Sequence, residues 1–303
     1  MTAEVGGMIA AGAAVLVAGA VLVRPRFQEA SGAARVLVLG PLCDAIALAI
    51  FATEHFTAAH GLAPMVPHWL PAHLFWVYFV GIAWLAAAIS FILWRCVEWS
   101  APHVALMMLL IVATLDVPNV AAGFHQRFFW ILLVREMSFA GGAMVLGGSV
   151  WPTANRWATA LMRIGRSIVA AVMIFYASQH FLFPRHVLGV PLEKLTPAWV
   201  PAPVLLAWVV GIALLLGGTG LFFRRFIRGA ATGAGTVLLL VTVFYYLPIL
   251  VVEFHTAPVE GLNYVGDTLL FAGTVLLAGL GANPVQSGNS SRPSLLRSTQ
   301  VSA

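Results

Sequence analysis

Apolar runs of about 20 residues recur along the whole chain and constrain its fold more than any other feature. Nine such runs can be counted, at roughly 5–23, 36–54, 73–94, 103–122, 130–150, 163–182, 203–223, 231–251 and 263–281. A helix of this length crosses the hydrocarbon core of a bilayer and satisfies its own backbone polar groups there. The sequence therefore predicts an all-α polytopic membrane protein with nine transmembrane helices.

The composition agrees with a membrane protein and excludes some other classes. The chain is 61% hydrophobic and 9% charged, whereas a soluble domain carries about 25% charged residues. Its basic residues stand in short clusters between apolar runs, so the net charge of +5 indicates membrane orientation and not nucleic-acid binding. Cys43 and Cys96 form no C-x-x-C motif, which disfavours dithiol chemistry. The expected partner is the lipid bilayer, with no nucleic acid.

The first apolar run is expected to be a retained helix and not a secretory signal. Glu4 precedes it without any Lys or Arg, while Arg24 and Arg26 follow it, which is the reverse of a signal peptide. Segment 1–35 is therefore predicted to be an N-terminal transmembrane helix, with its N-terminus outside, and a cytoplasmic loop.

The remaining basic residues extend this orientation to the rest of the chain. With the N-terminus outside, twelve Arg residues fall on the inner side and only Arg127, Arg135, Arg185 and Lys194 on the outer side. Positive charge favours the cytoplasmic side, so a bacterial-type inner membrane protein with a cytoplasmic C-terminus is predicted. Segment 282–303 is rich in Ser and Pro, lacks apolar periodicity, and is predicted to be a disordered cytoplasmic tail.

Two stretches of the chain share an order of landmarks that indicates an internal duplication. His55 in the first stretch, 54–71, matches His180 in the second, 179–201, and Trp69 likewise matches Trp199. The match predicts two four-helix units, 36–150 and 163–281, as parallel bundles with the same orientation. Asp116 likewise aligns with Tyr246 and Asp44 with Val169, and Glu136 and Asp267 stand just ahead of matching Phe-Ala-Gly motifs in the fourth helices.

Polar residues are expected to gather in an outward-facing pocket. Eight of the nine His residues map to the outer side or to outer helix ends, as do most acids. The competing interpretation is that these residues only cap outer helix ends. The candidate catalytic residues are Glu54, His55 and Glu136, and the candidate cofactor-binding residues are His180, Asp116, Tyr246, Asp267 and Asp44. No metal site is predicted.

Helical spacing gives these candidates an expected geometry. Asp44 lies three turns before His55 on one face, so Asp44 could form the floor of a cleft and His55 its rim. Arg135 and Glu136 are about 100° apart around their helix and are not expected to pair, so Glu136 is expected to meet His55 or Asp116. Pro118 and Pro248 are expected to bend the third helix of each unit.

The run F-x-x-E-H-F…P-x-W-L-P…F-W-V-Y-F-x-G-I-A, residues 51–83, with R-E-M-S-F-A-G-G-A at 135–143, resembles the DoxX family of small four-helix membrane proteins. The second unit resembles the family more weakly, with Gln179 in place of Glu54. The resemblance implies two DoxX-like bundles and a link to quinone-dependent or thiol-stress membrane complexes. It supplies no catalytic residue set.

Three functions remain open from the sequence. The leading hypothesis is a membrane subunit of a quinone-linked redox system, with a quinone as cofactor and other membrane or periplasmic redox subunits as partners. Nucleotide, flavin and haem motifs are absent from the sequence, so electrons would come through such a partner. The alternatives are a non-enzymatic scaffold or assembly factor and, more weakly, a small-molecule transporter with Asp44 as its coupling carboxylate. The sequence leaves open whether the chain is an enzyme.

Overall fold

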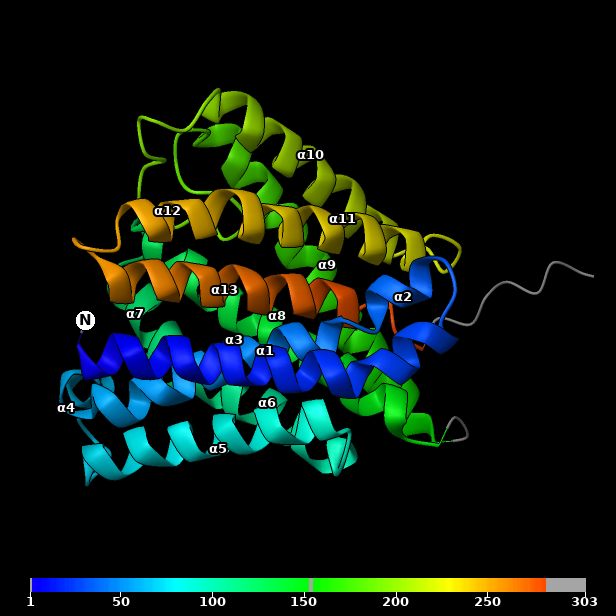
Figure 1. Ribbon diagram of the computed structural model, residues 1–303, viewed down its shortest axis with the longest axis horizontal. Coiled ribbons are helices and arrows are strands. Elements are labelled where there is room, and N and C mark those ends of the chain that lie inside the picture. The colour runs from blue at the N-terminus through cyan, green and yellow to red at the C-terminus, as the bar shows by residue number, and fades with distance from the viewer. Residues whose placement is uncertain (1, 153–154, 282–303) are drawn as a thin grey trace, which may run out of the picture.

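The computed structural model describes residues 2–152 and 155–281. In these residues all regular structure is helical, apart from an isolated bridge between His186 and Leu195 in a loop. The long helices lie side by side along the longest axis of the molecule (Figure 1). The predicted all-α class is confirmed.

In residues 2–152 and 155–281, nine long helices form the bundle and shorter segments join them. The long helices are α1 (Ala3–Glu29), α3 (Gly40–Thr57), α5 (His73–Leu93), α6 (Val97–Ile111), α8 (Arg127–Val150), α9 (Arg156–Leu182), α10 (Pro203–Leu221), α11 (Ile227–Val241) and α13 (Pro258–Leu277). The short ones are α2 (Ala33–Leu37), α4 (Ala59–Leu62), the 3-10 helix η1 (Ala63–Met65), α7 (Val117–Ala122) and α12 (Leu247–Val252). Two π-helical segments, η2 (Val112–Asp116) and η3 (Thr242–Tyr246), join α6 to α7 and α11 to α12.

Within the described residues, eight helices are long and apolar enough to cross a membrane, counting α2–α3, α6–α7 and α11–α12 as continuous helices. They correspond to the first eight predicted spans, so the protein is an integral membrane protein of the polytopic type. The ninth predicted span, 263–281, overlaps α13, which is not among the eight. Glu260, Asn263 and Asp267 lower the hydropathy of α13. The count of nine therefore stays a prediction.

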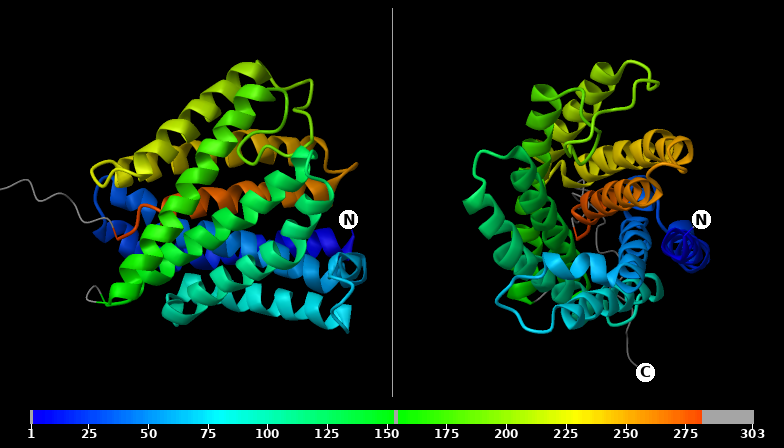
Figure 2. Two further views of the ribbon diagram at one scale, coloured as in Figure 1. Left: turned by 180° about the vertical axis from the view of Figure 1, so that it is seen from behind. Right: turned by 90° about the vertical axis from the view of Figure 1, so that its left-hand side faces the viewer.

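The first helix, α1, lies on the outside of the bundle (Figure 2). It packs mainly along α3, where Gly12 faces Ile50 and Gly19 faces Leu42. Small residues at such contacts let two membrane helices approach closely. Most of the rest of α1 is exposed, which suits contact with lipid.

The two predicted four-helix units share one core. Within the units α3 packs on α5 and α6 on α8, and likewise α9 on α10 and α11 on α13. The fourth helix of each unit also packs against the first helix of the other, giving the pairs α8–α9 and α13–α3. The two fourth helices, α8 and α13, meet each other between these pairs. A single hydrophobic cluster extends through both units.

Glycines make these contacts between the units close. A Cβ on Gly141 of α8 would lie 2.7 Å from the carbonyl oxygen of Gly165 on α9. At the matching α13–α3 contact, a Cβ on Gly273 would lie 2.9 Å from the carbonyl oxygen of Gly40. Neither position can take a larger residue without helix separation, so the interleaving of the units depends on these glycines.

Several local features recur at the spacing of the predicted duplication. The π segments η2 and η3 start 130 residues apart, at Val112 and Thr242, and each is followed by a proline at the second position of the next helix. Ala72 and Ala202, which precede α5 and α10, both have left-handed backbones, with φ of 55° and 46°. A π turn precedes each of Pro118 and Pro248, because each proline lacks the N–H that an α turn needs. The expected bend of the two helices stays a prediction. These shared features support the duplication.

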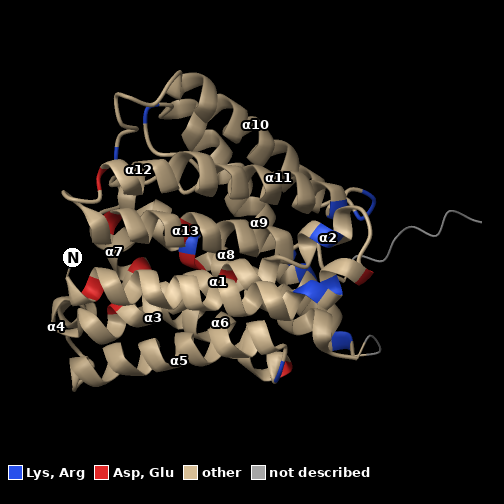
Figure 3. Cartoon of the chain, in the orientation of Figure 1, with Lys and Arg blue, Asp and Glu red and all other residues tan. Residues whose placement is uncertain are grey.

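Charged residues separate along the bundle (Figure 3). Lys and Arg side chains concentrate at the end where α2 lies, which we call the arginine-rich end, and most acids lie toward the opposite end or in the interior. The pattern matches the charge asymmetry from which the membrane orientation was predicted; the orientation itself stays a prediction.

Candidate functional site

Arg135 of α8 is the centre of a charged cluster inside the bundle. Its Nη1 donates to Oδ2 of Asp267 on α13 at 2.8 Å, and its Nη2 and Nε donate to Oε1 of Glu136 at 2.8 and 3.0 Å. The side chains of Arg135, Glu136 and Asp267 are 21%, 11% and 8% exposed. Arg135 lies about 12 Å along the axis from Arg127, where α8 begins, at about 1.5 Å per residue. The cluster is therefore well inside the helical layer.

The pairing of Arg135 with Glu136 corrects the expectation that these neighbours would not meet. The angle of about 100° between them applies to Cβ directions, and Arg carries a long side chain with donors at three nitrogens. Its guanidinium folds back to Glu136 while it also reaches Asp267, so both carboxylates are served by one cation. His55, one of the two partners expected for Glu136, lies elsewhere, against α5.

The packing contacts follow the register of the predicted duplication, in which Arg135 is the position that matches Asp267. Gly141 and Gly273 occupy matching places at the contacts between the units, and they are 132 residues apart. At that spacing Arg135 corresponds to Asp267, and Glu136 corresponds to Thr268. Two matching positions of the predicted duplication thus carry opposite charges and form an ion pair where α8 meets α13.

Two further acids approach this group. Asp116, at the end of η2, lies within electrostatic range of Glu136 and Arg135, is 7% exposed, and has an Oδ2 atom without a hydrogen-bond partner. Glu54, in the last turn of α3, accepts a hydrogen bond from Nδ2 of Asn263 at 3.0 Å and lies within range of Asp267. We call Glu54, Asp116, Arg135, Glu136 and Asp267 the Arg135 cluster.

Tyrosines surround the cluster. The hydroxyl of Tyr176 donates to the carbonyl of Ile131 at 3.2 Å and lies within range of Arg135 and Asp267. The ring of Tyr246 stacks on that of Tyr264, with centroids 5.9 Å apart and planes 11° from parallel. Both of these rings lie within range of Asp267. Aromatic surface thus adjoins the carboxylates.

The two candidate histidines lie outside the cluster. His55 Nδ1 is bonded to the carbonyl of Phe51 at 2.8 Å, and its ring meets that of Trp84 edge-on at 4.6 Å. His180, which is 2% exposed, is bonded through Nδ1 to the carbonyl of Tyr176 and accepts from the N–H of Gly189 at Nε2, 3.0 Å away. The bond from Gly189 places the proton of a neutral ring on Nδ1. Both nitrogens of His180 are occupied, so it anchors the chain instead of facing a pocket.

Asp44 does not form the floor of a cleft below His55. Its Oδ1 lies against Gly273 of α13 without a hydrogen-bond partner, whereas His55 packs against Gly81 and Trp84 of α5. The helix α3 lies between α5 and α13, so a small rotation along it directs the two side chains to different neighbours. The spacing of three turns was correct, but it does not fix which neighbouring helix each side chain meets.

The loop between α9 and α10, residues 183–202, closes over the bundle near the cluster; we call it the second loop. Residues 187–192 are buried in it. Tyr246 donates its hydroxyl to the carbonyl of Leu188, and Arg127 donates to the carbonyls of Pro191 and Leu192 at 2.8 and 3.2 Å. These bonds hold an apolar segment against helices from both units.

Lys194, in the second half of the second loop, forms ion pairs with two acids of the second unit. Its Nζ lies 2.8 Å from Oε2 of Glu253 and 3.0 Å from Oε2 of Glu260. Burial lowers the pKa of Lys194, but the hydrogen bonds and negative charges of Glu253 and Glu260 outweigh that effect, so the pKa lies above its ordinary value. The lysine therefore stays charged through the neutral range.

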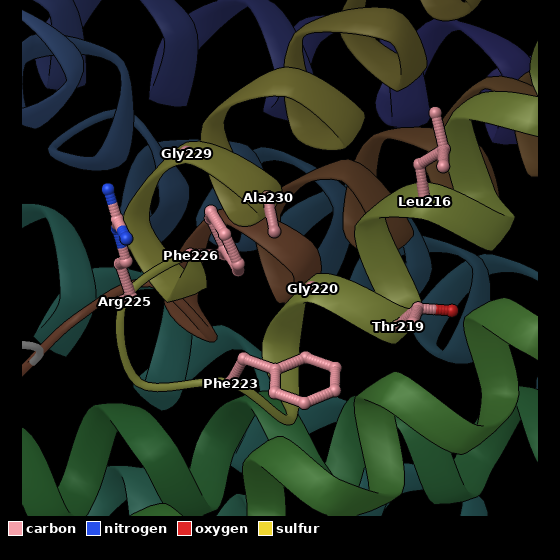
Figure 4. Close-up of a pocket in the computed structure, with 8 residues that line it drawn as sticks. All are labelled: Leu216, Thr219, Gly220, Phe223, Arg225, Phe226, Gly229 and Ala230. Atoms are coloured by element: carbon pink, nitrogen blue, oxygen red, sulfur yellow. The ribbon is translucent and has the colours of Figure 1, made fainter.

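The surface grooves lie away from the cluster. One of about 430 Å³ is at the arginine-rich end between α10 and α11 (Figure 4), and another of about 460 Å³ is lined by residues 70–75. Within residues 2–152 and 155–281, no three His, Cys, Asp or Glu side chains are grouped as a metal site requires. Within the cluster, Asp116 carries a carboxylate oxygen that has no hydrogen-bond partner.

Of the eight candidate residues, the structure brings five together: Glu54, Asp116, Glu136, Tyr246 and Asp267. Their part in an outward-facing pocket stays a prediction. The central position of Arg135 is not among the predictions from the sequence, which place its charge with the basic residues of the outer side. Arg135 lies five residues inside a predicted span, 130–150. A cation at that depth requires a buried partner, and this was the signal that could have identified it.

Fold and site together define the class of the protein: an all-α integral membrane protein with a buried ionic cluster between its helices. Comparison with models of protein families, with curated proteins and with solved structures found no match to this chain. The resemblance to the DoxX family accordingly stays a prediction from the sequence.

Proposed function

We propose that the protein is a DoxX-like membrane subunit of a quinone-linked redox system, and that the Arg135 cluster exchanges the protons that accompany quinone chemistry. The observation that carries this proposal is the group of acids at Arg135. Glu136 and Asp267 bond to its guanidinium and Asp116 of η2 lies within its electrostatic range, while Glu54 of α3 lies within range of Asp267. Asp116 contributes a carboxylate oxygen that has no hydrogen-bond partner.

The energetic argument starts from the cost of buried charge. An Asp or Arg near the centre of a membrane helix costs about 2.5–3.5 kcal/mol, and a buried ion pair is often no more stable than apolar residues of the same volume. A junction between α8 and α13 could therefore be built without charge. Membrane-embedded ionisable groups commonly serve proton or substrate pathways, and this is the role that we assign to the cluster.

The charge balance of the cluster suits proton exchange. Arg135 is a single cation, and Glu136, Asp267 and Asp116 are three acids within its reach. Carboxylates in excess of cations can share a proton and pass it on. Reduction of a quinone to a quinol takes two electrons and two protons; in this proposal an electron-donating partner subunit supplies the electrons and the cluster relays the protons.

The surroundings of the cluster suit a quinone as well. A quinone requires an apolar aromatic environment, hydrogen bonds to its carbonyls and a nearby proton donor. The rings of Tyr246 and Tyr264 stack on each other within range of Asp267, so aromatic side chains adjoin the acids. The other two candidate residues of the first unit, His55 and Asp44, lie outside this arrangement, so we assign them no part in it.

The test uses the full-length protein in nanodiscs that contain ubiquinone or menaquinone. Electrochemical reduction replaces the unidentified electron donor, and infrared difference spectra follow carboxyl bands as the quinone is reduced. We expect a carboxyl band that is lost in Asp116→Asn and kept in Glu98→Gln, a control at an exposed acid. A protein that neither retains nor binds quinone contradicts the proposal.

One observation favours a scaffold instead. All three donor nitrogens of Arg135 are bonded to carboxylates, and the ion pair with Asp267 joins the two predicted units. Such a network could serve only to lock the helices together for assembly with other membrane subunits. In that case Asp116→Asn would leave both the infrared spectrum and partner assembly unchanged, while Arg135→Gln would abolish assembly.

A further inference from the structure

The groove between α10 and α11 has a floor with few side chains. Figure 4 shows it between the end of α10, the connecting turn and the start of α11, with Phe223 and Phe226 at its sides. Gly220 and Gly229 also line it, and a Cβ added to Gly229 would meet no atom within 4 Å. The groove is therefore open surface that an elongated apolar group can fill.

Positive charge stands at the mouth of this groove. The turn between the helices carries Arg224 and Arg225, and Arg228 is the second residue of α11. Of these, Arg225 lines the groove itself. In the part of the chain that the structure describes, none of the three forms an ion pair with a carboxylate. Three arginines without counter-charges attract an anion to this turn.

An apolar stripe leads from the groove along α10 toward the opposite end. Leu205, Val209, Ile212 and Leu216 follow one another at helical spacing and are 63%, 51%, 49% and 68% exposed. Since α10 is on the outside of the bundle (Figure 1), this stripe faces the surrounding lipid. An anionic phospholipid matches these features. Its acyl chain suits the apolar stripe and the glycine-lined groove, and its headgroup suits the three arginines.

We infer that the groove between α10 and α11 binds an anionic phospholipid. Its phosphate lies at Arg224, Arg225 and Arg228. One acyl chain lies between Phe223 and Phe226 and continues along the apolar stripe of α10 that ends at Leu216. The glycine at position 229 leaves room for the chain, and the arginines select the charge of the headgroup. The site is independent of the Arg135 cluster and of the proposed quinone chemistry.

The test measures lipids retained by the full-length protein after purification from nanodiscs of equal phosphatidylglycerol and phosphatidylcholine, by native mass spectrometry. We expect tight retention of phosphatidylglycerol over phosphatidylcholine. Removing one arginine near a membrane surface weakens anionic-lipid binding about fivefold, so R224Q/R225Q/R228Q should lose nearly all of the preference. The control variant R24Q/R95Q/R163Q removes the same charge from other exposed sites and should keep the preference for phosphatidylglycerol.

A second variant tests whether the shape of the groove contributes to lipid binding in addition to the charge of the arginines. Gly229→Leu places an apolar side chain in the groove at a position where an added Cβ meets no atom within 4 Å, and it keeps every arginine. We expect it to reduce phosphatidylglycerol retention severalfold, while Gly61→Leu, at an equally open glycine in α4, leaves it unchanged. Equal retention of the two lipids by the unmodified protein would overturn the proposal. So would loss of the preference in the control triple variant, or full retention in Gly229→Leu.

Discussion

The two predicted units have matching backbones and contrasting side chains. Both have a π segment before a proline in the third helix, and both pack a glycine of the second helix (Gly81, Gly211) against a His-Phe pair of the first. Yet matching positions carry Arg135 and Asp267 at the α8–α13 contact, and Asp44 and Val169 in the first helices. The backbone is conserved between the units where packing demands it, and the polar residues are asymmetric.

The loops after the first helices differ most. The loop after α3 is largely exposed, whereas the second loop buries residues 187–192 and is held by Arg127, His180 and Lys194. Five additional residues let the second loop fold back over the bundle. The comparison shows that two units with the same helix arrangement can differ in their loops and in their polar residues. Only the second unit has a buried loop, and the ion pair between the units uses an arginine from one and an aspartate from the other.

The largest loss of stability is expected from breaking the ion pair between Arg135 of α8 and Asp267 of α13. Arg135→Gln leaves Glu136 and Asp267 buried without a cation, which costs about 3–5 kcal/mol of folding free energy. Thermal unfolding of the purified protein in detergent should show a large decrease in Tm. Arg95→Gln, at an exposed arginine, serves as the control and should leave Tm unchanged.

An increase in Tm is expected from a substitution at Asp44, where α3 differs from the matching helix α9. Asp44→Val introduces the residue of the matching position and removes a carboxylate whose Oδ1 has no partner. An unsatisfied buried polar group costs about 1–3 kcal/mol, so this variant should raise Tm. Val169→Asp is the reverse exchange and should lower it. A decrease in Tm for Asp44→Val would show that Asp44 has a partner or a structural role that the packing does not reveal.

The fold was predictable further than the site. Apolar runs identify the membrane helices because bilayer thickness fixes their length, and α13 escapes that criterion because Asn263 and Asp267 face the interior of the protein. The convergence of Glu54, Asp116 and Asp267 followed from their common depth near one side. The partner of each acid did not, because a pairing depends on helix rotation and side-chain reach, as the Arg135–Glu136 bonds show.

Glycines allow a matched test of the two loops. Gly189 has φ of +78° and donates its N–H to His180, so Gly189→Ala should cost about 1–2 kcal/mol through backbone strain. Gly61→Ala, in the helix of the first loop, should change stability by less than about 0.5 kcal/mol. Trypsin cleavage after Arg185 and Lys194 measures release of the second loop directly. Equal cleavage of Gly189→Ala and the unmodified protein would contradict the anchoring role of His180.

The smallest effect is a pH dependence of the second loop. The pKa of Lys194 is raised in the folded protein, so its contribution is complete below the unfolded pKa of about 10.4 and is lost as pH rises through the folded pKa. Hydrogen exchange of residues 187–192, corrected for its intrinsic pH dependence, should stay constant from neutral pH to about 10 and increase above that range. In Lys194→Met the loop should exchange faster already at neutral pH, without a further step at high pH.

The most direct test of the account is a double-mutant cycle between Arg135 and Asp267. Unfolding free energies of Arg135→Gln, Asp267→Asn and the double variant give the coupling between the two side chains. The ion pair across the α8–α13 contact predicts that the double variant is less destabilised than the sum of the singles by about 2 kcal/mol or more. Additive effects within about 0.5 kcal/mol would contradict a paired cluster at the junction of the two units.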